Sequence, residues 1–173
     1  LADNSGTGAG GTITLNSVAH TGGGTTSANS VSAAAAGTIN INSTTFTGNA
    51  SVIRANNTGA GNGGIVNITA PTSNLNAANV AATAAGAGTG GQITLTATTA
   101  IANIATAAVN VNNTGTSNAG TITFTGGGTV GFTAGASSIP ANATGTAGPG
   151  GITGSTGTAL NAAGPGLPTT PAN

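Results

Sequence analysis

The chain has 173 residues and almost no charge, because Asp3, Arg54 and His20 are its only ionisable side chains. It contains 32 glycines, three phenylalanines and no Trp, Tyr, Met or Cys. Without lysine and with one arginine, it lacks the positive charge that binds a phosphate backbone or an anionic membrane surface. No run of about 18 apolar residues is present, so the sequence predicts no membrane-spanning helix. The composition therefore argues against nucleic-acid binding and membrane insertion.

Small residues dominate the chain, and alanine supplies much of its apolar content. Alanine fills only a thin core, so narrow strand-to-strand packing suits this composition better than a helical bundle does. A near-neutral surface also lacks the charge repulsion that helps to keep proteins apart. We therefore expect a slim protein that tolerates contact with copies of itself.

Residues 1–9 are polar, glycine-rich and weakly patterned, and we expect a lead-in or docking segment there. From residue 10 onward a short unit recurs, in which two small residues precede a strand of alternating apolar and polar side chains. A period of 20 to 50 residues is typical of repeat architectures, because each unit can bury its apolar face only against its neighbours. The first inward positions of the units are 26 to 29 residues apart: Ile13, Ile39, Val66, Ile93 and Ile122.

The first unit, Gly10–Ala36, has a predicted strand at Thr12–Leu15. We interpret its glycine-rich stretch, Thr21–Asn29, as a flexible loop. The run Ala33–Ala36 is too short to offset the cost of helix nucleation, so it is interpreted as strand or corner.

The later units follow the same plan. The turn Asn56–Gly59 recurs as Asn112–Gly115, and both suit corners because Asn and Gly tolerate a positive φ. Stacked Asn side chains at these corners are expected to form ladders. The expected inward residues of the later units are Ile39, Ile41, Phe46 and Val52 or Ile53; Val66, Ile68, Leu75 and Val80; Ile93, Leu95, Ile101, Ile104, Val109 and Val111; and Ile122, Phe124, Val130, Phe132 and Ile139.

The pattern weakens beyond about residue 144. Gly151-Ile152 begins like a further copy that does not continue, and Pro165, Pro168 and Pro171 follow. Proline lacks the N–H that a central strand needs, so segment 145–173 is interpreted as a linker or as an arm that docks on another molecule.

Period-2 alternation at each unit start indicates strands rather than helices. We therefore predict an all-β fold, a parallel β-helix (β-solenoid) of about five coils of 26–29 residues, over residues 10–144. Each coil is expected to hold about three short strands and three corners. Backbone hydrogen bonds and apolar burial between coils, which are spaced by about 4.8 Å, would hold the rod together.

Two stretches carry a family resemblance: Asn57–Pro71, which reads NTGAGNGGIVNITAP, and Gly90–Ala97, which reads GGQITLTA. They resemble the filamentous-haemagglutinin-type repeats of large secreted bacterial exoproteins and adhesins, as a repeat style over about residues 10–125. The resemblance implies a right-handed parallel β-helix, secretion, and a role in adhesion or surface structure.

The sequence offers little for catalysis. Polysaccharide cleavage on a β-helix needs several carboxylates, or calcium held by carboxylates, and one Asp without any Glu supplies neither. Asp3, His20 and a serine are the residue types of a catalytic triad, but we interpret Asp3 as a lead-in residue and His20 as a loop-adjacent residue. His20 has no second His, Cys or Glu with which to bind a metal. We predict no enzyme activity, no cofactor, and no catalytic, cofactor-binding or metal site.

Two further features concern the surface. Arg54 follows Val52-Ile53 in a strand and is expected to point to solvent. Glycans are possible partners, because the sequence permits N-glycosylation without implying it. The six acceptor sequons are at Asn42, Asn49, Asn56, Asn67, Asn112 and Asn142.

The sequence favours an extracellular or cell-surface structural protein, the subunit of a self-assembling β-solenoid filament in a surface or biofilm-matrix fibre. Its main partners would be copies of itself. One alternative is a repeat segment of a large secreted adhesin. A second alternative is ice binding, because outward Thr12/Thr14, Thr94/Thr96 and Thr121/Thr123/Thr125 resemble the threonine columns of ice-binding β-solenoids. Thr38/Asn40 and Ile65/Asn67 are expected to interrupt that array.

Overall fold

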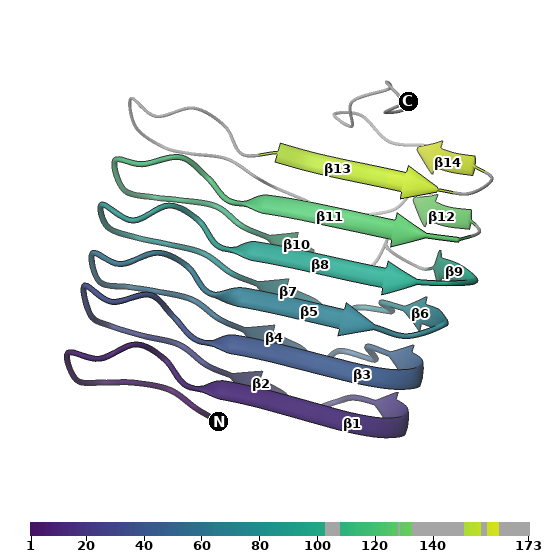
Figure 1. Ribbon diagram of the computed structural model, residues 1–173, viewed down its shortest axis with the longest axis horizontal. Helices are drawn as coiled ribbons and strands as arrows, with labels where there is room; N and C mark the ends of the chain where they lie inside the picture. The colour runs from purple at the N-terminus through teal and green to yellow at the C-terminus, as the bar shows by residue number, and fades with distance from the viewer. Residues whose placement is uncertain (103–107, 128, 133–150, 157–158, 163–173) are drawn as a thin grey trace.

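The computed structural model describes residues 1–102, 108–127, 129–132, 151–156 and 159–162. Within these ranges every strand pair is parallel and no helix forms, so the predicted all-β parallel solenoid is confirmed. Equivalent strands of successive coils lie above one another in rows, from β1 at one end to β13 at the other (Figure 1).

Each coil contributes strands to three faces. The long face contains β1 (Thr12–Thr21), β3 (Thr38–Thr47), β5 (Ile65–Thr69), β8 (Gln92–Ala97), β11 (Thr121–Gly126) and β13 (Gly151–Thr156). The second face contains the end of β3, then β6 (Thr72–Asn74), β9 (Ala100–Ala102), β12 (Thr129–Phe132) and β14 (Ala159–Ala162). The third face contains β2 (Thr25–Ser27), β4 (Val52–Arg54), β7 (Asn79–Ala81) and β10 (Ala108–Asn110). The third coil, with β5, β6 and β7, shows the expected three strands.

The first coil differs from the expectation in two ways. β1 does not end at Leu15 but continues to Thr21, because it follows β3 around a corner and pairs with it on both sides of that corner. The stretch Thr21–Asn29 is not a loop throughout, since it contains β2, which pairs in register with β4. Backbone hydrogen bonds to the next coil order this glycine-rich segment, whose only apolar side chain is the buried Ala28.

The solenoid also continues past residue 144. Within the segment 145–173, β13 pairs with β11 and β14 pairs with β12, so part of the expected tail adds to the stack. Ladder hydrogen bonds need only backbone groups, which explains why a weak side-chain pattern still forms strands. The remainder of that segment lies outside the described residues, as do Ile104, Ile139 and Asn142.

The apolar core lies inside the three faces as columns of stacked side chains. One column joins Ile13, Ile39, Val66, Ile93 and Ile122 in register, as the sequence predicted. The next joins Leu15, Ile41, Ile68, Leu95 and Phe124. On the third face, Ile53 rather than Val52 is buried.

A column of glycines precedes the long face and sets how closely the coils approach. A Cβ added to Gly37, Gly64, Gly91 or Gly120 would lie 1.8–2.1 Å from the carbonyl oxygen of the equivalent glycine one coil earlier. No side chain fits at that distance. The glycines that open each sequence unit are therefore required by backbone contact between coils.

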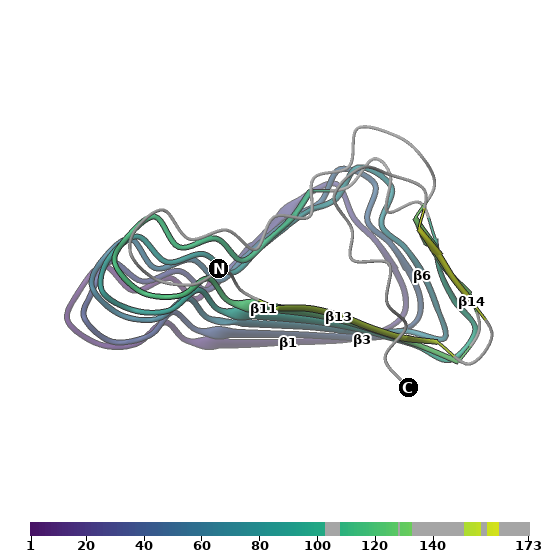
Figure 2. The same cartoon turned by 90° about the horizontal axis from the view of Figure 1, so that it is seen from above.

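A lobe projects from the roughly triangular section that the three faces enclose (Figure 2). In each coil it is the ten-residue loop between the third face and the long face: 28–37, 55–64, 82–91 and 111–120. A hydrogen bond that we call the neck closes each lobe, from the N–H of its last glycine to the carbonyl of its first residue. The N···O distances are 2.7 Å for Gly37–Ala28, Gly64–Ala55 and Gly91–Ala82, and 2.9 Å for Gly120–Val111.

Segment 1–9 forms one more lobe, which precedes β1 at the N-terminal end of the stack. Gly11 N–H donates to the Ala2 carbonyl at 2.8 Å, and Asn4 forms a parallel bridge with Ser30 of the second lobe. The segment therefore docks on the lobe of the first coil, residues 28–37.

Gly91→Ala is expected to destabilise the fold by at least about 1–3 kcal/mol, because its Cβ would meet the Gly64 carbonyl oxygen at 2.0 Å. Gly24→Ala is the matched control, since no atom lies within 4 Å of its added Cβ. Urea denaturation of both variants measures the difference. Equal midpoints would contradict the role assigned to the glycine column.

Ser73→Ala is expected to stabilise the fold by about 1 kcal/mol, because its fully buried hydroxyl has no hydrogen-bond partner. Ser30→Ala is the control: its hydroxyl is equally buried but lies 3.0 Å from the Ser32 hydroxyl and accepts the Ser32 N–H at 3.2 Å. The midpoint temperature of thermal unfolding should rise for Ser73→Ala and fall for Ser30→Ala. A loss of stability in Ser73→Ala would show that this hydroxyl has a partner in solution.

Candidate functional surfaces

The interior of the lobe is polar, in contrast to the apolar core of the three faces. Five residues stack there as successive parallel bridges: Asn4, Ser30, Asn57, Ala84 and Asn113. The last four are almost completely buried. Since a buried polar group is costly unless it is hydrogen-bonded, the bonds of these side chains decide whether the lobe is stable.

Asn57 and Asn113 bind the backbone of the lobes. The Oδ1 of Asn57 accepts the Gly59 N–H at 2.7 Å, and its Nδ2 donates to the Ala34 carbonyl of the preceding coil at 2.5 Å. The Oδ1 of Asn113 accepts the Gly115 N–H at 2.7 Å, and its Nδ2 lies within 2.6–3.3 Å of three carbonyl oxygens. These amides replace the backbone partners that a tight polar loop lacks.

The expected Asn ladders occur, but not at these corners. Side-chain amides pair between coils on the outer side of the long face, from Asn42 to Asn16 and from Asn67 to Asn40, each at 2.9 Å. In the lobe the column passes through Ala84, which has no amide. Asn57 and Asn113 therefore bind backbone groups instead of one another.

A second ladder runs beside the neck. The side-chain oxygen of one coil accepts the N–H of the equivalent residue in the next: Asp3 from Asn29 at 2.7 Å, Asn29 from Asn56 at 2.9 Å, and Asn56 from Thr83 at 3.0 Å. Asp3 also accepts the Ser27 hydroxyl at 2.8 Å. The only acidic side chain of the chain is thus the first rung of this ladder.

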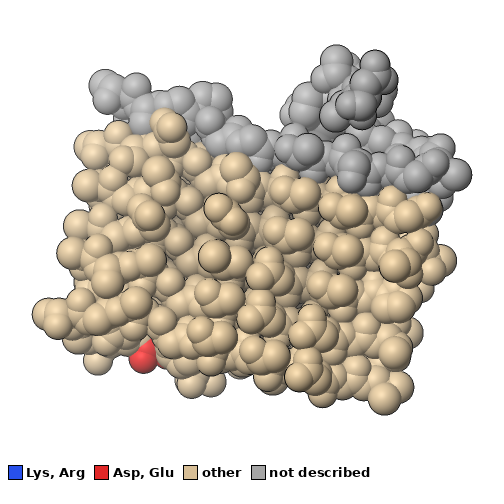
Figure 3. Space-filling view, in the orientation of Figure 1, with Lys and Arg blue, Asp and Glu red and all other residues tan. Residues whose placement is uncertain are grey.

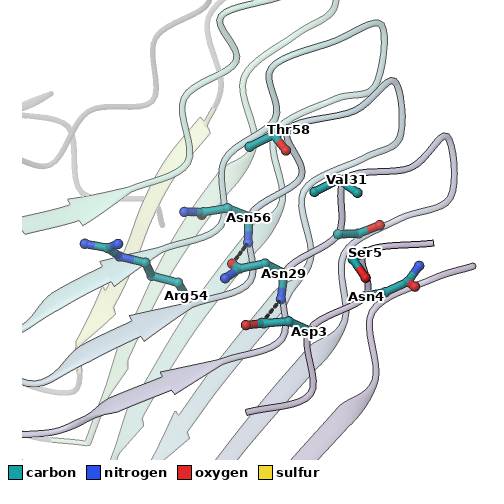
Figure 4. A pocket seen from close by; sticks show the side chains of 9 residues that line it. Asp3, Asn4, Ser5, Asn29, Val31, Arg54, Asn56 and Thr58 are labelled. Atoms are coloured by element: carbon teal, nitrogen blue, oxygen red, sulfur yellow. Dashed lines mark hydrogen bonds between the residues drawn. The ribbon is translucent and has the colours of Figure 1, made fainter. Parts of the chain in front are cut away.

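Asp3 and Arg54 line one groove of about 430 Å³ on the outside of the neck, together with Asn29, Asn56 and Thr58 (Figure 4). Arg54 is exposed, as predicted, and its guanidinium points away from Asp3. His20 lines a different hollow, with the corner Gly22–Gly24. The structure therefore does not bring Asp3 and His20 together.

Within the described ranges, no three His, Cys, Asp or Glu side chains gather where they could hold a metal ion. The same part of the chain contains no helix with the length and apolarity needed to span a membrane.

The view onto the long face is almost uncharged: its one red spot, at the lower edge of the molecule, marks the single acidic residue (Figure 3). The outward residues of the long face align across the coils. One outward column reads Thr14, Asn40, Asn67, Thr94 and Thr123, so two asparagines interrupt the threonines, as the sequence indicated. Ice binding by this face stays a prediction.

The N-terminal end of the stack has an open edge. β1 pairs only with β3, so its other edge faces away from the protein. Ile13 and Leu15 are only partly buried there, whereas Ile39 and Ile41 one coil further in are fully buried. The last side chains of these two apolar columns, Ile13 and Leu15, are therefore partly exposed at the N-terminal end of the stack.

Comparison with known proteins finds no matching family, no matching curated protein and no matching solved structure.

Asn113→Ala is expected to cost about 1–3 kcal/mol of stability, because it leaves the Gly115 N–H and three carbonyl oxygens without their amide partner. Asn42→Ala is the control, since the side-chain hydrogen bond from Asn42 to Asn16 is exposed and its loss should cost less than about 0.5 kcal/mol. Denaturant unfolding distinguishes them. Similar small losses of stability in both variants would show that water replaces the hydrogen bonds of the Asn113 side chain.

Proposed function

We propose that this chain is an extracellular structural protein whose β-solenoid stacks end to end into a fibre through the open edge of β1. The single observation that carries the proposal is this edge, where a ten-residue strand exposes one side and the apolar columns stop at the half-buried Ile13 and Leu15. A strand edge of this kind pairs with another chain unless it is blocked.

The surface chemistry supports the same proposal. Natural edges are commonly protected by lysine, by inward-pointing charge or by proline, and β1 contains no lysine, no proline and no permanently charged residue. With one acidic and one basic side chain in the whole chain, electrostatic repulsion between copies is negligible. Association would depend on backbone hydrogen bonds and apolar contact, and the fibres should resist moderate salt.

A repeat segment of a large secreted adhesin is the second candidate, and the same edge favours it. In that case the surface of β1 would meet a further coil of a longer chain rather than a second copy. The oligomeric state separates the two candidates, because only the first predicts polymers of this chain alone.

Thr14→Pro is designed to block the edge without disturbing the fold. In the ladder, Thr38 N–H donates to the Gly11 carbonyl of the preceding coil at 3.0 Å. Thr14 pairs with Asn40, two residues after Thr38, so by the alternation of a parallel strand its N–H faces the open edge. Proline at this position removes a donor to the neighbouring copy and leaves the β1–β3 ladder intact.

We expect the unmodified chain and Thr14→Val, which keeps the N–H, to form fibres visible by electron microscopy. Thr14→Pro should remain monomeric in light scattering, with a nearly unchanged unfolding temperature. A monodisperse unmodified chain at high concentration would reject the filament, and fibres of Thr14→Pro would reject this edge.

A further inference from the structure

His20 occupies an inward position of the first coil. It pairs in register with Phe46, which pairs with Ser73, which pairs with Ile101. All three partners are buried in the core. The only histidine of the chain is therefore the terminal member of a core column, at the end where β1 is open.

The imidazole ring stacks on the Phe46 ring, with centroids 5.1 Å apart and an interplanar angle of 7°. One face of the imidazole is thus covered by the second coil, and the opposite face is directed toward the open end. Beside it lies a hollow of about 230 Å³ lined by Gly22–Gly24, Thr25, Thr26 and Ser51. A coil that stacks on β1 would cover this exposed ring face and close the hollow.

No charged group stabilises a protonated ring here. The elements around His20 are β3, β2, the corner Gly22–Gly24 and Ser51, and the side chains that they bring to the hollow are uncharged. Asp3 is held by Ser27 and Asn29 beside the neck, and Arg54 lines the groove there. Partial burial lowers the pKa of His20 below its usual value of about 6.5.

We propose that His20 makes stacking at the β1 end dependent on pH, so that neutral imidazole is accepted in the junction and imidazolium is rejected. The inference rests on the proposed fibre function and adds its regulation. The joined state would bury the ring between Phe46 and the incoming coil, where a charge without a partner is strongly disfavoured.

The direction of the pH dependence follows from linkage. Burial lowers the pKa of His20 further in the joined state, so the joined state binds fewer protons than the free end. Association is therefore strongest at pH values above the pKa of the free end. Below that pKa, the association constant falls by about tenfold per pH unit for one His20 per junction.

The experiment measures association of the full chain by sedimentation velocity from pH 8 to pH 5, with far-UV circular dichroism to confirm that the monomer stays folded. The unmodified chain should assemble at pH 8 and, below the pKa of His20 at the free end, lose about tenfold in association constant per pH unit. His20→Phe and His20→Gln are neutral at every pH and should assemble equally at pH 5 and pH 8. His20→Lys, which carries a charge throughout, should not assemble at either pH.

Asp3→Asn is the matched control, since it removes the only side-chain carboxylate of the chain away from the His20 hollow and should keep the pH response of the unmodified chain. Equal association of the unmodified chain at pH 5 and pH 8 would overturn the inference, and so would an undiminished pH response in both His20→Phe and His20→Gln. Failure to associate at pH 8 would instead reject the fibre function itself.

Discussion

Backbone hydrogen bonds between successive coils, kept in register over the whole described stack, are the interaction on which the structure depends. They require each coil to approach the next at backbone distance along all three faces and through the lobe. The glycine column before the long face permits this approach, because a Cβ at Gly64 or Gly120 would overlap the carbonyl of the coil before it. The inward columns then follow, since equal spacing places side chains of the same kind above one another.

Two interiors of different chemistry share this one ladder. Inside the three faces, Ile, Leu, Val and Phe exclude water and supply the hydrophobic contribution to stability. Inside the lobe, asparagine and serine bind backbone groups that the short loop cannot satisfy alone. The neck hydrogen bond separates the two interiors in each lobe that the structure describes. A chain with so few large residues can therefore order a coil of 26–29 residues, because hydrogen bonds from polar side chains stabilise the lobe, which the thin apolar core does not reach.

Because the chain has almost no charge, the ends of the stack become the main candidates for controlling association. Most protein surfaces control association through many charges, whereas in the proposed fibre the edge of β1 and the residues beside it would do so. His20 matters for this reason. It is the one side chain at that end whose charge changes near neutral pH, and it lies at the end of a core column rather than on an outer face.

The sequence by itself determined the repeat, the strand starts and most of the core. Alternation with a fixed period identifies inward residues such as Ile39 and Leu95, since a strand has only two sides. The tertiary structure alone decided the lobe, the choice of Ile53 over Val52, the full length of β1 and the inward position of His20. Small and polar residues near the lobe and the corners carry no period-2 signal. Their positions depend on hydrogen bonds to residues nine places away in the same coil or about 27 places away in the next, which only the assembled stack brings together.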